Sequence, residues 1–423
     1  MAKKKRKLKK KRIALLLLVM ILLIGIPSCL FLLNNNKNKP LQPKTKEINM
    51  QSFKEKNIQE LEEFAKENNL ILEKEYEYSS LEKDTIISQS IQEGTPLKKG
   101  DTIKVIISKG EVPVSVYEEN KVNELGNVPI MMYHGIHDMK DSETQYTGGN
   151  VDKDGYNRTA ESFRKDLEFY YQNNYRMIRL TDYIDGVIDV PLGKSPIIIT
   201  FDDGKENNFK VLGEKNGELE IDPNCAVGIL EEFKNKYKDY NVTATFFVNS
   251  GIFQQEEYNE KILKWLVNHG YDIGNHTMTH PDFTKISGER TQQEVGGIYK
   301  ILDSIIPGKY VNIIAMPFGS PYKKSHPNFN IMLKTTYEGK TYETKSMLRV
   351  GWEGETSPFD KEFDKTFLKR IRAYDNNGKE FDISMNFKIL ENTRYISDGD
   401  KDTVVVLAKD KDRVNTSKLV RTY

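Results

Sequence analysis

The stretch SPIIITFDDG, residues 195–204, ends a run of three isoleucines on two adjacent carboxylates, Asp202 and Asp203. Consecutive β-branched residues favour a strand inside a core. A buried, unpaired carboxylate costs several kcal/mol unless a cation or hydrogen bonds compensate for its charge. The stretch therefore predicts a core strand whose carboxyl end carries a charged, functional site.

Similar apolar segments recur from residue 128 to the C-terminus, separated by helical stretches such as 161–173 and 257–269. Strand–helix alternation predicts a parallel sheet or a barrel, in which chemistry gathers where strands end. Polar stretches at 138–160 and 205–224 are expected to be loop insertions. The expected strands are VPIMMYH (128–134), SPIIITFDD (195–203), VTATFFV (242–248), DIGNH (272–276), VNIIAMPFG (311–319) and SMLRVGW (346–352).

A second polar motif, GNHTMTH at residues 274–280, places His276 and His280 four residues apart. This spacing puts two side chains on the same side of a helical turn. One aspartate and two histidines are a plausible set of three metal ligands that leaves a position open for water, as in catalytic zinc sites. The motif alone is also compatible with a solvated turn, but the FDDG strand upstream favours the metal site.

TFDDG and H-T-x-x-H, with the strand TATFFV between them, resemble the first two motifs of the polysaccharide deacetylases, the NodB-homology or family-four carbohydrate esterases. The resemblance covers most of residues 128–410. It implies an α/β fold, a distorted (β/α) barrel, and a divalent metal, usually zinc, held by Asp203, His276 and His280. It also implies that Asp202 is the general base.

This assignment agrees with the chemistry of amide hydrolysis. A metal ion lowers the pKa of bound water toward about 7 and polarises the carbonyl group. Asp202, beside the metal but not bound to it, can then take the remaining proton. An acid must finally protonate the leaving amine, or the intermediate collapses backwards.

Three positions depart from the family's later motifs. The third motif, AMPFG, has Ala315 in place of an arginine that normally orients the catalytic aspartate. The fourth has Leu348 where an aspartate is expected. The best match to the fifth, VVVLAKD, has Lys409 in place of the acid histidine. These departures leave the tuning of Asp202 and the identity of the acid open.

Other residues are candidates for the missing roles. MMYHGI resembles the N-terminal Tyr-His element of deacetylases that act on poly-N-acetylglucosamine, so His134 is a candidate acid or orienting group. A histidine bonded to the backbone in the core is the alternative. Pro317 and Phe318 match the third motif and are expected to bind substrate. Trp352 can stack on a sugar ring, or belong to the core.

Residues 50–110 predict a small α+β domain. Apolar residues recur at helical spacing over 53–69, and three strands are expected from ILEKEYEY, TIISQSIQ and TIKVIISKG. The segment from Gln89 to Asp101 resembles the PASTA domain. This resemblance implies a module that contacts peptidoglycan or only spaces other domains from the membrane.

The N-terminal region predicts a membrane anchor. Residues 1–12 include the basic run KKKRKLKKKR, and residues 13–33 form an uncharged apolar stretch that is long enough to cross a hydrocarbon core of about 30 Å. The positive-inside rule then places everything after Leu33 outside the cytoplasm. A cleaved signal peptide or a lipoprotein signal ending at Cys29 are alternatives. Because the basic run faces the anionic inner leaflet, we expect no nucleic-acid partner.

The predicted order is therefore a cytoplasmic segment, a transmembrane helix, a linker (34–49), the PASTA-like domain, a connector (111–127) and a catalytic domain (128–423). The predicted function is metal-dependent removal of N-acetyl groups from a cell-envelope glycan, either peptidoglycan or poly-N-acetylglucosamine. The alternative is a catalytically impaired protein that binds glycan or organises the wall.

Overall fold

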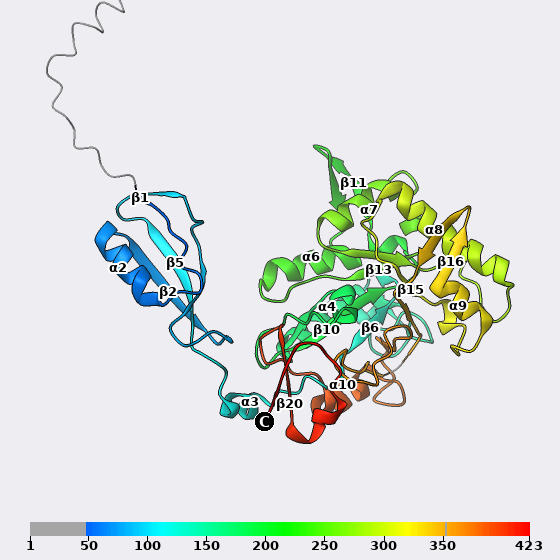
Figure 1. The fold of residues 1–423 in the computed structure, drawn as a ribbon. Coiled ribbons are helices and arrows are strands. Elements are labelled where there is room, and N and C mark those ends of the chain that lie inside the picture. Colours follow the sequence, from blue (N-terminus) through cyan, green and yellow to red (C-terminus); the bar gives the residue numbers. More distant parts are fainter. Residues whose placement is uncertain (1–47, 352) are drawn as a thin grey trace, which may run out of the picture. The chain divides into compact units, whose positions relative to one another are not determined.

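The computed structural model describes residues 48–351 and 353–423 (Figure 1). These residues belong to two compact units, one ending at Glu111 and the other comprising Val112–Tyr423. The expected transmembrane helix at 13–33 lies outside the described residues. Among the helices that the structure does describe, none is long and apolar enough to cross a membrane.

The small unit has the expected helix and three strands. Helix α2 (Ile58–Asn68) begins after Asn57, whose side chain accepts a hydrogen bond from the backbone N–H of Gln59. The sheet has the order β2 (Ile71–Glu77), β5 (Thr102–Ser108), β3 (Ile86–Gln89). The β2–β5 pair is parallel and the β3–β5 pair antiparallel. A short pair, β1 (Ile48–Asn49) and β4 (Pro96–Leu97), completes the unit.

The large unit is built on one parallel sheet of eight strands (Figure 1). Each of the six expected apolar segments supplies a strand to it, so the sequence interpretation is confirmed for them. In spatial order the main path is β18 (Ser346–Leu348), β15 (Ile313–Ala315), β14 (Asp272–Asn275), β13 (Thr245–Val248), β10 (Ser195–Phe201), β6 (Ile130–Tyr133) and β19 (Ile371–Arg372).

Two strands were not expected from the sequence, because each is short and includes an arginine instead of forming an apolar run. Strand β9 (Tyr175–Met177) pairs with β10, and β19 pairs with β6. The sheet curls, since a parallel bridge joins Leu348 at one edge to Leu368, just before the strand at the other edge. The architecture is thus a curled parallel half-barrel.

Helices cover the outside of this sheet. Apolar side chains of α4 (Ala160–Gln172), α6 (Ala226–Lys236) and α7 (Asn259–Asn268) form the largest core cluster with β10, β13 and β14. Helix α8 (Gly288–Ile305) packs on both α7 and β14. A second cluster, which includes Ile130, Ile198, Ala315 and Leu348, fills the inner side.

The large unit has further helices and strands. Among them are α5 (Leu180–Ile184), α9 (Pro327–Leu333), β16 (Lys334–Tyr337), β17 (Lys340–Glu343) and α10 (Ile383–Thr393).

The structure differs from expectation at residues 111–127. Instead of a charged connector, this segment contains helix α3 (Val114–Asn120), and from Val112 onward it belongs to the large unit. Tyr117 and Val122 pack against Val405 of β20 (Thr403–Val406). Strand β20 pairs with β21 (Leu419–Thr422) in a separate two-stranded sheet.

The two expected insertions are folded. The first contains β8 (Arg158–Thr159), which pairs with β7 (Ile136–His137). The second contains the hairpin of β11 (Val211–Lys215) and β12 (Glu218–Ile221). Both insertions begin at strand ends that carry predicted site residues.

Candidate metal centre and active site

Three predicted metal ligands converge at the carboxyl ends of β10 and β14. Ligand atoms of Asp203, His276 and His280 all lie within 4.8 Å of one another. Asp203 Oδ1 lies 3.2 Å from His276 Nε2 and 3.7 Å from His280 Nε2. The arrangement matches the one-carboxylate, two-imidazole set expected for a divalent metal.

The orientation of His276 fits a metal ligand. Its Nδ1 lies 2.8 Å from the carbonyl oxygen of Ala315. A carbonyl only accepts hydrogen bonds, so Nδ1 donates and the lone pair of a neutral ring is on Nε2. Nε2 is buried and has no hydrogen-bond partner among the described residues. A buried lone pair aimed at a carboxylate is well suited to a cation, and the backbone carbonyl is a typical outer partner of a ligating histidine.

The helical turn expected for the two histidines is not present. Residues 276–280 form a loop, in which Thr277 and His280 have φ of 67° and 57°. The loop is held by Glu294 of α8, which accepts hydrogen bonds from the Thr279 backbone N–H (2.7 Å) and hydroxyl (2.6 Å). The histidines therefore converge through left-handed backbone conformations stabilised by a neighbouring helix, a feature that residue spacing does not encode.

The electrostatics of the triad also favour a cation. Burial raises the pKa of Asp203, but the neighbouring His276 imidazole and the other charges nearby outweigh it, so the pKa lies below its usual range. Burial lowers the pKa of His276, yet Asp202 and Asp203 raise it above its usual value overall. A site that draws a proton onto a buried imidazole is short of positive charge, and a metal ion supplies it.

Asp202 is paired with an arginine that sequence reasoning missed. It is 1% exposed and receives two charge-assisted hydrogen bonds from Arg370, at 2.8 Å to Oδ1 and 2.7 Å to Oδ2. Arg370 is itself fully buried and also donates to Thr200 and to the carbonyl of Arg349. Although burial raises the pKa of Asp202, Arg370 and His276 hold it below its usual range. The aspartate is therefore ionised even though it is buried.

Arg370 provides the interaction with Asp202 that Ala315 cannot make. The guanidinium expected from the third motif comes instead from the residue just before β19, at the far end of the sheet. It reaches Asp202 because β19 pairs with β6, and β6 pairs with β10. Ala315 keeps a role through its backbone, as the acceptor for His276.

His134 lies in the same pocket as the triad and Asp202. It is partly buried, its Nδ1 lacks a partner among the described residues, and its ring meets Tyr156 edge-on at 5.0 Å. Burial lowers its pKa to about 4, against the opposing pull of Asp202 and Asp203. His134 is thus neutral near pH 7.

The backbone on both sides of His134 is held in place. Asn208 donates from Nδ2 to the His134 carbonyl at 2.6 Å, and the Gly135 N–H donates to Asn157 at 2.9 Å. A Cβ at Gly135 would lie 2.7 Å from Asn157 Oδ1, so any other residue there would displace the Asn157 amide. His134 is therefore positioned by both insertions.

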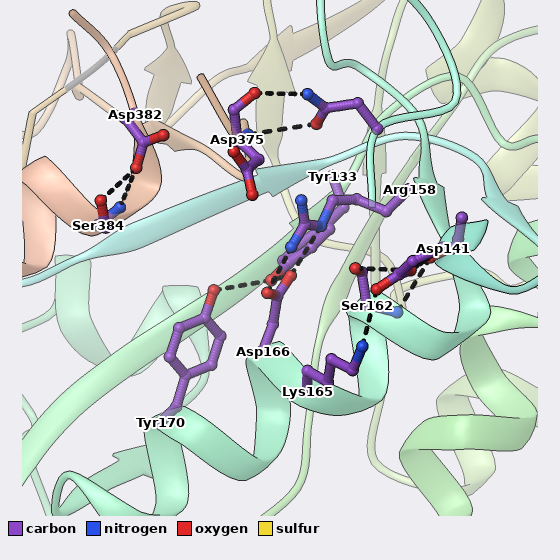
Figure 2. A network of polar contacts seen from close by, with 12 residues as sticks. Tyr133, Asp141, Arg158, Ser162, Lys165, Asp166, Tyr170, Asp375, Asp382 and Ser384 are labelled. Carbon is purple, nitrogen blue, oxygen red and sulfur yellow. Dashed lines mark hydrogen bonds and ion pairs between the residues drawn. The ribbon is translucent and has the colours of Figure 1, made fainter. Parts of the chain in front are cut away.

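A buried polar network anchors the strand that carries His134 (Figure 2). Asp166 of α4 accepts two hydrogen bonds from Arg158, at 2.6 and 3.0 Å, and one from the Tyr133 hydroxyl at 3.0 Å. The Tyr133 hydroxyl also lies 2.8 Å from that of Tyr170. Because these buried groups hydrogen-bond to one another, they fix the end of β6 directly before His134.

The pocket over the site has a volume of about 320 Å³, within the range of small-ligand sites. Phe318 lines it, is 56% exposed, and meets the His280 ring at 4.6 Å. Pro317 is buried and is not among the lining residues, so it shapes the turn instead of contacting the pocket directly. Trp352 lies outside the described residues. The remaining lining residues include Asp152, Tyr156, Lys205, Met316 and Val350.

The match to the fifth motif does not lie in the parallel sheet. VVVLAKD begins in β20, and exposed Lys409 lies in the short helix η5 (Ala408–Arg413). The absence of a histidine there is therefore not a loss from the site. The pocket instead has His134.

Comparisons with known proteins agree with this geometry. Residues 189–337 match the family model for polysaccharide deacetylases, and residues 48–109 match that for PASTA domains. The chain contains a polysaccharide deacetylase domain. The matched relatives are themselves named as deacetylases of peptidoglycan sugars.

The polysaccharide deacetylase domain accounts for the similarity to curated proteins. The chain is 29% identical over 129 residues to a peptidoglycan-N-acetylglucosamine deacetylase of Bacillus cereus, covering 30% of this chain and 38% of that protein. It is 29% identical over 123 residues to the peptidoglycan-N-acetylmuramic acid deacetylase PdaA of Bacillus subtilis, covering 29% of this chain and 37% of that protein. It thus spans less than two fifths of either relative. The solved deacetylase PplD of Streptococcus pyogenes, in complex with acetate, is 19% identical with a TM-score of 0.44, covering 62% of this chain and 97% of that one.

Sequence reasoning missed Arg370, Asn208 and Lys205. Arg370 has no local motif, and its only signal is an arginine before a two-residue strand. Lys205 and Asn208 follow TFDDG directly, where a site residue could have been sought.

Proposed function

We propose that this protein hydrolyses N-acetyl groups on a cell-envelope polysaccharide with the help of a divalent metal held by Asp203, His276 and His280. A set of one carboxylate and two imidazoles favours zinc as that metal. The observation that carries the proposal is the bidentate pairing of Asp202 with Arg370 beside that triad. A structural metal site needs no second, ionised carboxylate at its side. A hydrolytic site needs one as a base.

The roles follow from the geometry. When bound, the metal supplies Lewis acidity, which lowers the pKa of water and polarises the amide carbonyl. Asp202 accepts a proton from the attacking water, and Arg370 keeps that carboxylate ionised and oriented. Both of its oxygens are bonded to Arg370, which restricts the direction in which it approaches the pocket.

His134 is assigned as the acid for the leaving nitrogen. With a pKa of about 4, it enters the reaction neutral. It therefore acts as an acid only after the proton that Asp202 takes from the attacking water passes to its ring, and it then delivers that proton to the amine. This shuttle explains why a neutral histidine is positioned by hydrogen bonds to the backbone on both sides.

The substrate class and location complete the proposal. The named activities of the relatives support peptidoglycan, whereas the Tyr-His element supports poly-N-acetylglucosamine. The PASTA domain supports contact with the wall. The apolar stretch 13–33 supports a single-pass membrane anchor with both units outside the cytoplasm.

The test is acetate release by the full chain from peptidoglycan and from poly-N-acetylglucosamine. Activity should disappear after chelation and return with zinc. His276→Ala should abolish it, because it removes a ligand. His269→Ala is the matched control: that residue ends α7, stacks on Trp265 and lies outside the pocket. Glycan binding without acetate release would support the wall-organising alternative.

A further inference from the structure

The two oxygens of the Asp203 carboxylate have different neighbours. Oδ1 faces both imidazoles, at 3.2 and 3.7 Å. Oδ2 forms an ion pair with Lys205, whose Nζ lies 3.2 Å away. One oxygen of the carboxylate therefore faces the candidate metal position, and the other pairs with a lysine two residues further along the chain.

The backbone of Lys205 is held in place. Its N–H donates to Asn208 Oδ1 at 3.0 Å, and Asn208 Nδ2 donates to the carbonyl of His134 at 2.6 Å. Asn208 is fully buried. Lys205 lines the pocket with its side chain 33% exposed. The ammonium group thus extends from a fixed point beside Asp203.

A carboxylate binds a metal through one oxygen or through both. Zinc favours four ligands, whereas larger hard cations gather six or more oxygen ligands and commonly use both carboxylate oxygens. An ammonium group on Oδ2 occupies that oxygen and leaves only Oδ1 for the metal.

We propose that Lys205 is a positioning residue that keeps Asp203 a one-oxygen ligand and so sets the preference of the site for zinc over cations of higher coordination number. This inference rests on the metal site of the proposed function. It adds a determinant of metal choice that lies outside the three ligands.

The ratio of two metal affinities separates this role from simple repulsion. The positive charge of Lys205 repels all divalent ions alike, so its removal strengthens the binding of each by the same factor. Freeing Oδ2 instead favours an ion that takes a second carboxylate oxygen. Only the latter effect changes the ratio of zinc affinity to manganese affinity.

The experiment compares the chelated full-length protein with its Lys205→Met and Lys205→Arg variants, titrated separately with Zn²⁺ and Mn²⁺. Lys210→Met is the matched control, because Lys210 pairs with Asp222 at the same 3.2 Å but outside the pocket over the triad. Lys205→Met should lower the zinc-to-manganese affinity ratio about tenfold, the lower end of the range by which outer-sphere changes alter metal affinity. Lys205→Arg and Lys210→Met should keep it.

A second readout reports coordination directly. In the cobalt-substituted protein, Lys205→Met should weaken the visible absorption bands, because intensity falls as coordination number rises above four. An unchanged ratio with unchanged cobalt bands would overturn the role of Lys205 and leave the proposed function intact. Failure of the wild-type chain to bind either ion would overturn the proposed function and this inference with it.

Discussion

Among the described residues, Arg370 is the only cation hydrogen-bonded to Asp202, and replacing it with methionine removes that partner. Both side chains are almost completely buried, and two charge-assisted hydrogen bonds are lost. Breaking a buried ion pair by removing one partner costs about 3–5 kcal/mol. Since a kcal/mol shifts Tm by roughly 2–4 °C in domains of comparable size, we expect Tm to fall on the order of 10 °C.

Activity should fall more steeply than stability. Without Arg370, burial dominates the pKa of Asp202 and raises it, so the carboxylate takes up a proton and no longer serves as a base. General acid–base groups typically contribute about 10²- to 10⁴-fold to rate, and kcat/KM should drop by that order. Activity is measured per folded molecule, below the Tm of the variant.

Two comparisons separate the contribution of Arg370 to stability from its contribution to activity. Asp202→Asn combined with Arg370→Met leaves no buried charge, so this double variant should recover part of the lost Tm and none of the activity. Arg413→Met breaks another arginine–aspartate pair, at 2.6 Å, whose arginine is 49% exposed. It should cost less stability and leave activity unchanged. An Arg370→Met protein with wild-type activity would refute the assignment of Asp202 as an oriented base.

Four further outcomes are expected. In the chelated protein, thermal stability should fall as pH drops from 6.5 toward 4, because the unfolded chain protonates His134 near 6.5 and the folded chain only near 4; His134→Gln should flatten this dependence in a series of melts. Zinc at a hundred times its Kd should stabilise the wild type by about 2.7 kcal/mol in melting experiments, and His276→Ala should show no such shift. Phe318→Ala should raise KM roughly two- to tenfold with little change in kcat, the range of aromatic contact energies; an unchanged KM would exclude Phe318 from substrate contact. Asn208→Leu should cost about 1–3 kcal/mol by denaturant titration, since the Lys205 N–H and the His134 carbonyl both lose their partner.

The local sequence was sufficient to locate most of the sheet and the metal ligands. Buried parallel strands are continuous apolar runs, and six of them were located from such runs in the sequence. The resemblance of TFDDG and H-T-x-x-H to the deacetylase motifs then named Asp203, His276 and His280 as candidate ligands without a structure. Very short strands such as β19 escape this reading because their pairing depends on neighbours in space.

Only the tertiary structure decided how the site is completed. His276 and His280 converge through left-handed backbone conformations held by Glu294, where spacing predicted a helical turn. Arg370 reaches Asp202 across 168 residues of sequence because β19 pairs with β6 and β6 with β10, while the motif position carries Ala315. The burial of a strand can be read from its own apolar residues. The partner of a buried charge cannot, because it depends on which distant segments the folded chain brings together.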